Sequence, residues 1–193
     1  MIKHLSQPEY MHVLLNPLPI YGLSMGVLAL VIALVWRARP ARVTAFAIIF
    51  LSSLSVWPVS YYGDSGYDRI QAVADDDGIK WLDQHVHRAQ KLIPLYYALA
   101  ALSIVVTVLE FAAPRAAAKT GIALLLLAIV TLGGGAYIAY PGGRVRHREF
   151  RFEPAPTKPH ETTPDETPEQ KDASLTANSK RAMGNIPKIG LGI

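Results

Sequence analysis

Long uncharged stretches alternate with short charged segments along the first three quarters of the chain. Four stretches are long enough to cross the hydrocarbon core of a membrane as helices, which takes about 20 residues. They are Leu18–Trp36, Val43–Ser60, Leu92–Leu109 and Thr120–Gly143. Only a helix satisfies its backbone hydrogen bonds inside lipid without neighbouring segments. The pattern therefore predicts an all-α fold, a four-helix transmembrane bundle over residues 1–143, followed by an extended Pro-rich tail over residues 144–193.

Composition supports this class and excludes others. Charged residues make up 18% of the chain, against about 25% in soluble domains. The absence of cysteine excludes disulfides, thiolate metal sites, iron–sulfur clusters and covalent c-type haem attachment. The net charge of +4 comes mainly from residues that flank the spans, so we expect the lipid bilayer as a partner and no nucleic acid.

Basic residues in the short hinges predict an orientation. Arginines crowd the hinge Arg37–Arg42, and Arg115 and Lys119 lie in the hinge between the last two spans. The positive-inside rule places such hinges in the cytoplasm. The arginines of Arg144–Arg151 argue for the opposite orientation, but the first span carries more weight. We therefore expect a multi-pass protein of the bacterial inner membrane with both termini and the segment Tyr61–Gln90 on the periplasmic side.

The segment Tyr61–Gln90 separates the second and third spans and is predicted to be a loop followed by a helix. Gly63 and Gly66 suit a turn. The run Asp75–Gly78 is typical of a helix N-cap, and the apolar residues after it recur at helical spacing. This helix is expected to continue into the third span, with Pro94 as a kink.

Small residues and the tail indicate where contacts form. Gly22 and Gly26, and the run Gly133–Gly135, would let helices approach a neighbour closely, either in this chain or in another subunit. The tail is rich in Pro, Thr and Glu and ends in the apolar stretch Ile186–Ile193. Such a composition does not bury enough apolar surface to fold alone. We expect the tail and the small-residue helix faces to bind other subunits of a membrane complex.

All six histidines lie on one side of the membrane in this topology. Four of them are candidate ligands of a haem or another metal: His12, His85, His87 and His147. A b-type haem needs two axial histidines from facing helices. Residues 85 and 87 lie about 200° apart on a helix, so at most one faces the bundle. A haem site would pair His12 with one of the others and be lined by nearby tyrosines and Trp57 or Trp81. The alternative is that these interfacial histidines bind lipid phosphate or loop groups, with no cofactor.

Three segments carry a family resemblance: His12–Ile20, Trp81 to His85, and Gly142–His147. Over residues 10–147 the chain resembles the four-span membrane family called domain of unknown function 2231, whose first helix opens with a His-Pro-x-x-x-His-Phe-Pro-Ile-type motif. His12, Pro19 and Ile20 match this motif, whereas Pro17 stands where its second histidine would be. The resemblance implies a four-helix membrane domain with a redox role, because members are sometimes fused to cytochrome c-like modules.

The motifs that mark hydrolases and transferases are missing from the chain. It has no Gly-rich phosphate loop, no metalloprotease motif and no carboxylate pair within a span. We therefore predict a non-catalytic accessory subunit of a larger membrane complex, in respiratory or photosynthetic electron transfer, with no cofactor of its own. The alternative is a free-standing b-type cytochrome or quinone-interacting redox protein with haem at the outer face.

Overall fold

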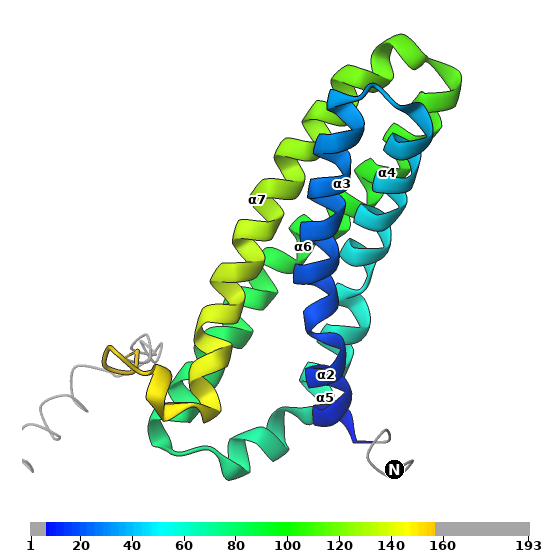
Figure 1. The fold of residues 1–193 in the computed structure, drawn as a ribbon. Helices are drawn as coiled ribbons and strands as arrows, with labels where there is room; N and C mark the ends of the chain where they lie inside the picture. The colour runs from blue at the N-terminus through cyan, green and yellow to red at the C-terminus, as the bar shows by residue number, and fades with distance from the viewer. Residues whose placement is uncertain (1–6, 157–193) are drawn as a thin grey trace, which may run out of the picture. The chain divides into compact units, whose positions relative to one another are not determined.

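A computed structural model describes residues 7–156, which form two helical hairpins side by side and contain no strand (Figure 1). The first hairpin consists of α2 (Pro8–Leu15), the π-helical turn η1 (Leu18–Gly22), α3 (Leu23–Val35), α4 (Arg39–Leu54) and α5 (Val56–Val73). The second consists of α6 (Asp76–Ala112) and α7 (Pro114–Arg146), followed by the short 3-10 helix η2 (Arg148–Phe150). The predicted all-α four-helix bundle is confirmed. The predicted tail beyond Pro156 lies outside the described residues.

Four helical segments are long and apolar enough to cross a membrane, so the protein is a multi-pass membrane protein. They are Pro8–Val35, Arg39–Val73, Asp76–Ala112 and Arg115–Arg146. In the most apolar part of each, only 22% to 39% of the residues are buried inside the protein, which leaves apolar side chains for lipid. The 37 residues of α6 span about 55 Å, well beyond a hydrocarbon core of about 30 Å.

The core lies between α3, α4, α6 and α7. Its largest fully buried apolar side chains include Leu23, Leu30, Phe46, Leu99 and Leu124. The glycines of the first span serve this packing: a Cβ atom built at residue 26 would lie 2.7 Å from Cγ1 of Ile49 on α4. The small-residue face of the first span therefore packs within the chain. In the second glycine run, a Cβ at residue 135 would clash with the Tyr96 hydroxyl on α6, whereas a Cβ at residue 133 would meet nothing within 4 Å.

The predicted loop Tyr61–Gln90 is wrong in its first half and right in its second. Gly63 and Gly66 lie inside α5 and make no turn, because helix α2 packs against them: a Cβ at residue 66 would lie 3.0 Å from the backbone nitrogen of Glu9. The hairpins are joined only by Ala74 and Asp75, between α5 and α6. The predicted cap is confirmed, since the Asp75 carboxylate accepts a hydrogen bond from Gly78 N at 2.8 Å. Helix α6 then continues without interruption into the third span.

A buried ion pair joins the hairpins at the end where the Arg37–Arg42 hinge lies, which we call the hinge end. Glu110 on α6 is fully buried and pairs with Arg42 on α4. The Nε and Nη2 atoms of Arg42 both donate hydrogen bonds to the Glu110 carboxylate. Arg39 adds a hydrogen bond from Nη2 to the Glu110 backbone oxygen at 2.9 Å. A lone glutamate ending an apolar stretch was the signal available for this contact.

Candidate functional site

At the opposite end, which we call the pocket end, the two hairpins enclose a cavity of 320 Å³. Its walls come from α2, η1 and α5 of the first hairpin and from α6 and α7 of the second. The floor is apolar: Ile20, Val56 and Ile93 line it. The volume falls at the lower end of the range for small-molecule and cofactor sites, about 300–1,000 Å³.

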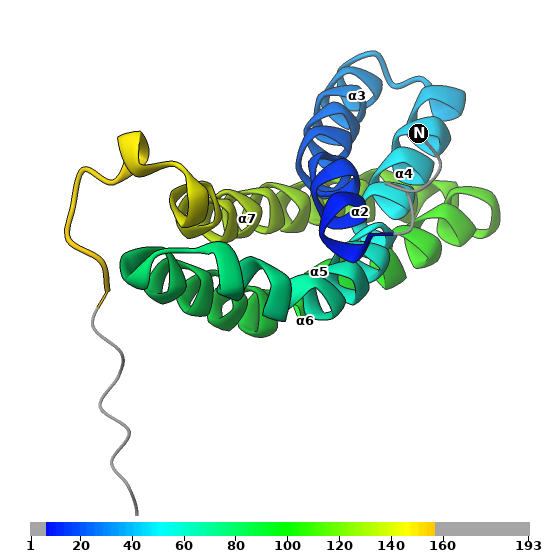
Figure 2. The same cartoon turned by 90° about the horizontal axis from the view of Figure 1, so that it is seen from below.

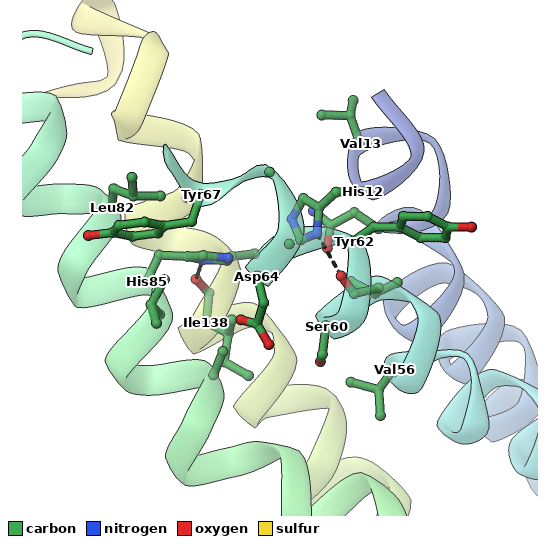
Figure 3. A pocket seen from close by; sticks show the side chains of 18 of the residues that line it. His12, Val13, Val56, Ser60, Tyr62, Asp64, Tyr67, Leu82, His85 and Ile138 are labelled. Carbon is green, nitrogen blue, oxygen red and sulfur yellow. Dashed lines mark hydrogen bonds between the residues drawn. The ribbon is translucent and has the colours of Figure 1, made fainter. Parts of the chain in front are cut away.

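His12 reaches into this cavity from the first hairpin (Figure 3). It lies on α2, and its Nδ1 is 2.8 Å from the carbonyl oxygen of Val59 on α5. Because a carbonyl oxygen only accepts, Nδ1 carries the proton, and the Nε2 of a neutral ring keeps its lone pair. The ring rests against Gly63, one helical turn after Val59, where a Cβ would lie 2.8 Å from Nδ1. Any side chain at residue 63 would occupy the space of the imidazole.

His85 repeats this arrangement in the second hairpin. It lies on α6, and its Nδ1 donates to the carbonyl oxygen of Ile138 on α7 at 2.8 Å. The ring rests against Gly142, one turn after Ile138, where a Cβ would lie 2.9 Å from Nδ1. Each imidazole is therefore oriented by its own hairpin, with Nε2 left for a ligand. A hydrogen bond from Nδ1 to a backbone carbonyl is a common way to fix the ring of a metal-ligating histidine.

The two rings face each other across the cavity. Their centroids are 6.3 Å apart and their planes are inclined at 86°. Figure 3 shows His12 and His85 extending toward each other from opposite walls, with Asp64 beside the space between them. A metal bonded by both Nε2 atoms at roughly 2 Å would place the centroids about 6 Å apart. The observed separation thus suits one metal centre between the two imidazoles.

The other two candidate histidines do not reach the cavity. His87 is exposed on the far side of α6, as the helical spacing from His85 predicted. The side chain of His147 is 57% exposed and pairs with Glu149 at 2.8 Å. His147 follows the end of α7, which carries it past the helices that build the cavity. His4 and His160 lie outside the described residues.

The predicted aromatic lining is partly corrected. Tyr62, Tyr67 and Tyr96 line the cavity, but neither tryptophan does. Trp57 is 64% exposed on the outer surface. Trp81 is buried one helical turn before His85, and its ring packs against Tyr140 of α7 with 6.5 Å between centroids. Trp81 and His85 are four residues apart and lie on the same general face of α6. Only the packing of α7 therefore decides that His85 lines the cavity and Trp81 does not.

The mouth of the cavity is bounded by Val145 and Arg146 at the end of α7. The segment after α7 is tied down beside it, because Arg151 donates to the carbonyl oxygens of Arg144 and Val145 and to the Asp75 carboxylate at 2.8–2.9 Å. The Arg151 guanidinium and the Gly78 N–H hold the pKa of Asp75 well below its usual range. Arg148 adds a second ion pair, with its Nε 2.9 Å from the Asp75 carboxylate. Arg151 therefore links the C-terminus of α7 to the N-cap of α6, and Arg148 reinforces the link. No local sequence pattern predicts this link, because Arg151 and Asp75 are 76 residues apart.

The donor set limits which groups fit the cavity. Within residues 7–156, no group of three or more His, Asp or Glu side chains is placed to hold a metal ion. Zinc sites take three or four protein ligands, whereas a haem iron, held by its macrocycle, takes two axial ligands. The lining also carries two carboxylates, Glu9 and Asp64. Two opposed imidazoles, an apolar floor and the cationic Arg146 at the mouth, suited to a propionate, are the features that fit haem.

Comparison of the chain with protein-family models, with curated proteins and with solved structures finds no match in any of the three. The resemblance to the domain of unknown function 2231 family therefore stays a prediction, and function is inferred from the geometry of the site.

Proposed function

We propose that this protein is a membrane-embedded redox protein that binds one b-type haem at the pocket end, with His12 and His85 as axial ligands. The carrying observation is the pair of imidazoles 6.3 Å apart, each with Nδ1 bonded to a backbone carbonyl. Bound haem supplies a reversible one-electron couple between ferric and ferrous iron. Electron transfer across or along the membrane is the function that this couple supports.

The residues of the chain have separate tasks in this proposal. The Val59 and Ile138 carbonyls keep Nδ1 protonated, which leaves the Nε2 lone pairs for iron. Ile20, Val56 and Ile93 exclude water from the inner edge of the site, and a drier site shifts the reduction potential. Arg146 at the mouth offers a charge partner for a propionate.

Absorption spectroscopy with matched histidine variants tests the proposal. The full chain, expressed with added haem and purified in detergent, should show a Soret band and, after reduction with dithionite, a b-type α-band. His12→Ala and His85→Ala should each abolish the low-spin spectrum. His87→Ala and His147→Ala are the controls and should leave it unchanged, because both side chains are exposed outside the cavity. A colourless wild-type protein, or a spectrum that survives both of the first two substitutions, would refute the haem site.

The wider setting is also part of the proposal. We place the protein in a bacterial inner membrane with the pocket end on the periplasmic side, which the basic hinge Arg37–Arg42 supports through the positive-inside rule. The chain has no cysteine, so single cysteines at Ala38 and Ala72 report the orientation directly. A membrane-impermeant maleimide applied to intact cells should label position 72 and not position 38. The reverse pattern would invert the orientation and leave the bundle intact.

Two related roles stay predictions. An accessory role in an electron-transfer complex was inferred mainly from the tail, most of which lies outside the described residues. A quinone-interacting role is compatible with the free Nε2 atoms of His12 and His85, which would accept hydrogen bonds from the hydroxyls of a quinol. The spectrum distinguishes the quinone role from the haem site, since a quinol leaves the protein without a Soret band.

A further inference from the structure

The two halves of the cavity follow one plan, and we infer that Gly63 and Gly142 are positioning residues that set the planes of the axial imidazoles perpendicular to each other. The inference rests on the proposed haem site. It concerns how the two imidazoles are oriented. It predicts the energy splitting of the iron d orbitals, which ligation by two histidines does not by itself determine.

The plan is the same in each hairpin. A histidine on the entering helix donates Nδ1–H to a carbonyl on the returning helix, and a glycine lies four residues after that carbonyl. The first hairpin uses His12, Val59 and Gly63, and the second uses His85, Ile138 and Gly142. Residues four apart occupy the same face of a helix, so the carbonyl and the glycine form a single seat for the ring.

The glycine in each seat leaves no room for a side chain. A Cβ at residue 63 would lie 2.8 Å from Nδ1 and 3.0 Å from Cε1 of His12. At residue 142 it would lie 2.9 Å and 3.2 Å from the same atoms of His85. The atoms approached belong to the ring itself, so an alanine would turn or displace the imidazole. Gly133, on the same helix but outside the cavity lining, has nothing within 4 Å of its Cβ position.

Because each seat belongs to a different hairpin, the angle between the rings is set by how the hairpins pack. That angle is 86°. Rotation of an imidazole about its bond to iron decides which iron d orbital receives its π-electron density. Perpendicular rings keep the two relevant orbitals close in energy, whereas parallel rings separate them. Orientation of axial ligands by outer hydrogen bonds is one of the means by which a protein tunes a metal.

Electron paramagnetic resonance of the ferric protein reads this orientation. The wild type should give the strongly anisotropic low-spin signal of perpendicular imidazoles, with one large maximum g value. Gly63→Ala and Gly142→Ala should keep the Soret band and move the signal toward the three-line rhombic form. Gly133→Ala on the same helix is the control and should keep the wild-type signal, because residue 133 lies outside the cavity lining and a Cβ there meets nothing within 4 Å.

The outcomes separate this inference from the haem site. A wild-type protein without a Soret band would overturn both. A Soret band with a rhombic wild-type signal would overturn the inference about the glycines and leave the haem site intact. This measurement uses the wild type, so no variant has to fold. Identical signals in wild type, Gly63→Ala and Gly142→Ala would also overturn it. Loss of haem in Gly142→Ala, with Gly133→Ala still loaded and both variants monodisperse, would support the positioning role, because a displaced imidazole no longer reaches the iron.

Discussion

The polar side chains at the two ends of the bundle find their bonding partners in opposite ways. Polar side chains from both hairpins meet at each end. At the hinge end, the charges of Glu110 and Arg42 are paired directly with each other. Figure 2 views the helices from the pocket end. There, His12 and His85 bond to backbone within their own hairpins and leave their Nε2 atoms facing a cavity (Figure 3). The polar groups of a contact that stabilises the fold bond to each other, whereas those of a ligand site keep donor or acceptor atoms without a protein partner.

Breaking the hinge end should have the largest effect on stability. Glu110→Gln leaves the Arg42 charge, 12% exposed, without its counterion. Removing one partner of a buried pair costs roughly 3–5 kcal/mol. The free energy of unfolding in detergent, from denaturant titration, measures the loss. Glu149→Gln on the exposed surface is the control, with an expected change within about 0.5 kcal/mol.

A double substitution sharpens this result. Arg42→Met with Glu110→Leu replaces both charges by apolar groups, which is often neutral in buried sites. The double variant should therefore recover most of the stability lost in Glu110→Gln. If Glu110→Gln unfolds at the wild-type denaturant concentration, the Glu110–Arg42 pair does not stabilise the bundle.

The pocket end should contribute less to the stability of the haem-free protein. His12→Ala and His85→Ala each remove one hydrogen bond, and a typical bond contributes about 1 kcal/mol. Denaturant titration without haem measures these changes against His147→Ala, which is exposed. If either histidine variant loses as much free energy of unfolding as Glu110→Gln does, the two histidines stabilise the fold as strongly as the ion pair. The contrast between the two ends would then be wrong.

The smallest effect concerns the link between α6 and the segment after α7, and it depends on pH. The pKa of Asp75 is lowered in the folded protein, first by Arg151 and then by the Gly78 N–H. Its contribution is therefore complete above the unfolded-state pKa, about 4, and is lost as the pH falls through the lower folded-state value. Asp75→Asn keeps a good N-cap and removes the charge.

Thermal unfolding of wild type and Asp75→Asn checks this sign. The variant should be slightly less stable at neutral pH, and the two melting temperatures should converge as the pH drops below about 4. A difference that widens on acidification would contradict the role of the Asp75–Arg151 pair.

The amino-acid sequence alone determined the four spans, the membrane class and the cap at Asp75. These depend on local properties: the length of an apolar run, the need to satisfy backbone groups in lipid, and a side chain that bonds a backbone N–H three residues away. Helical spacing also showed that His85 and His87 do not both face the bundle.

Only the tertiary structure decided which histidine meets His12, why Gly63 and Gly66 lie inside a helix, and that Glu110 is buried against Arg42. Glycine suits a turn as well as a close helix contact, and the sequence around residues 63 and 66 does not distinguish them. The distinction arises because α2 packs on α5 and brings His12 and Glu9 against those glycines. The site is a relation between two hairpins, and such relations depend on packing between residues far apart in the chain.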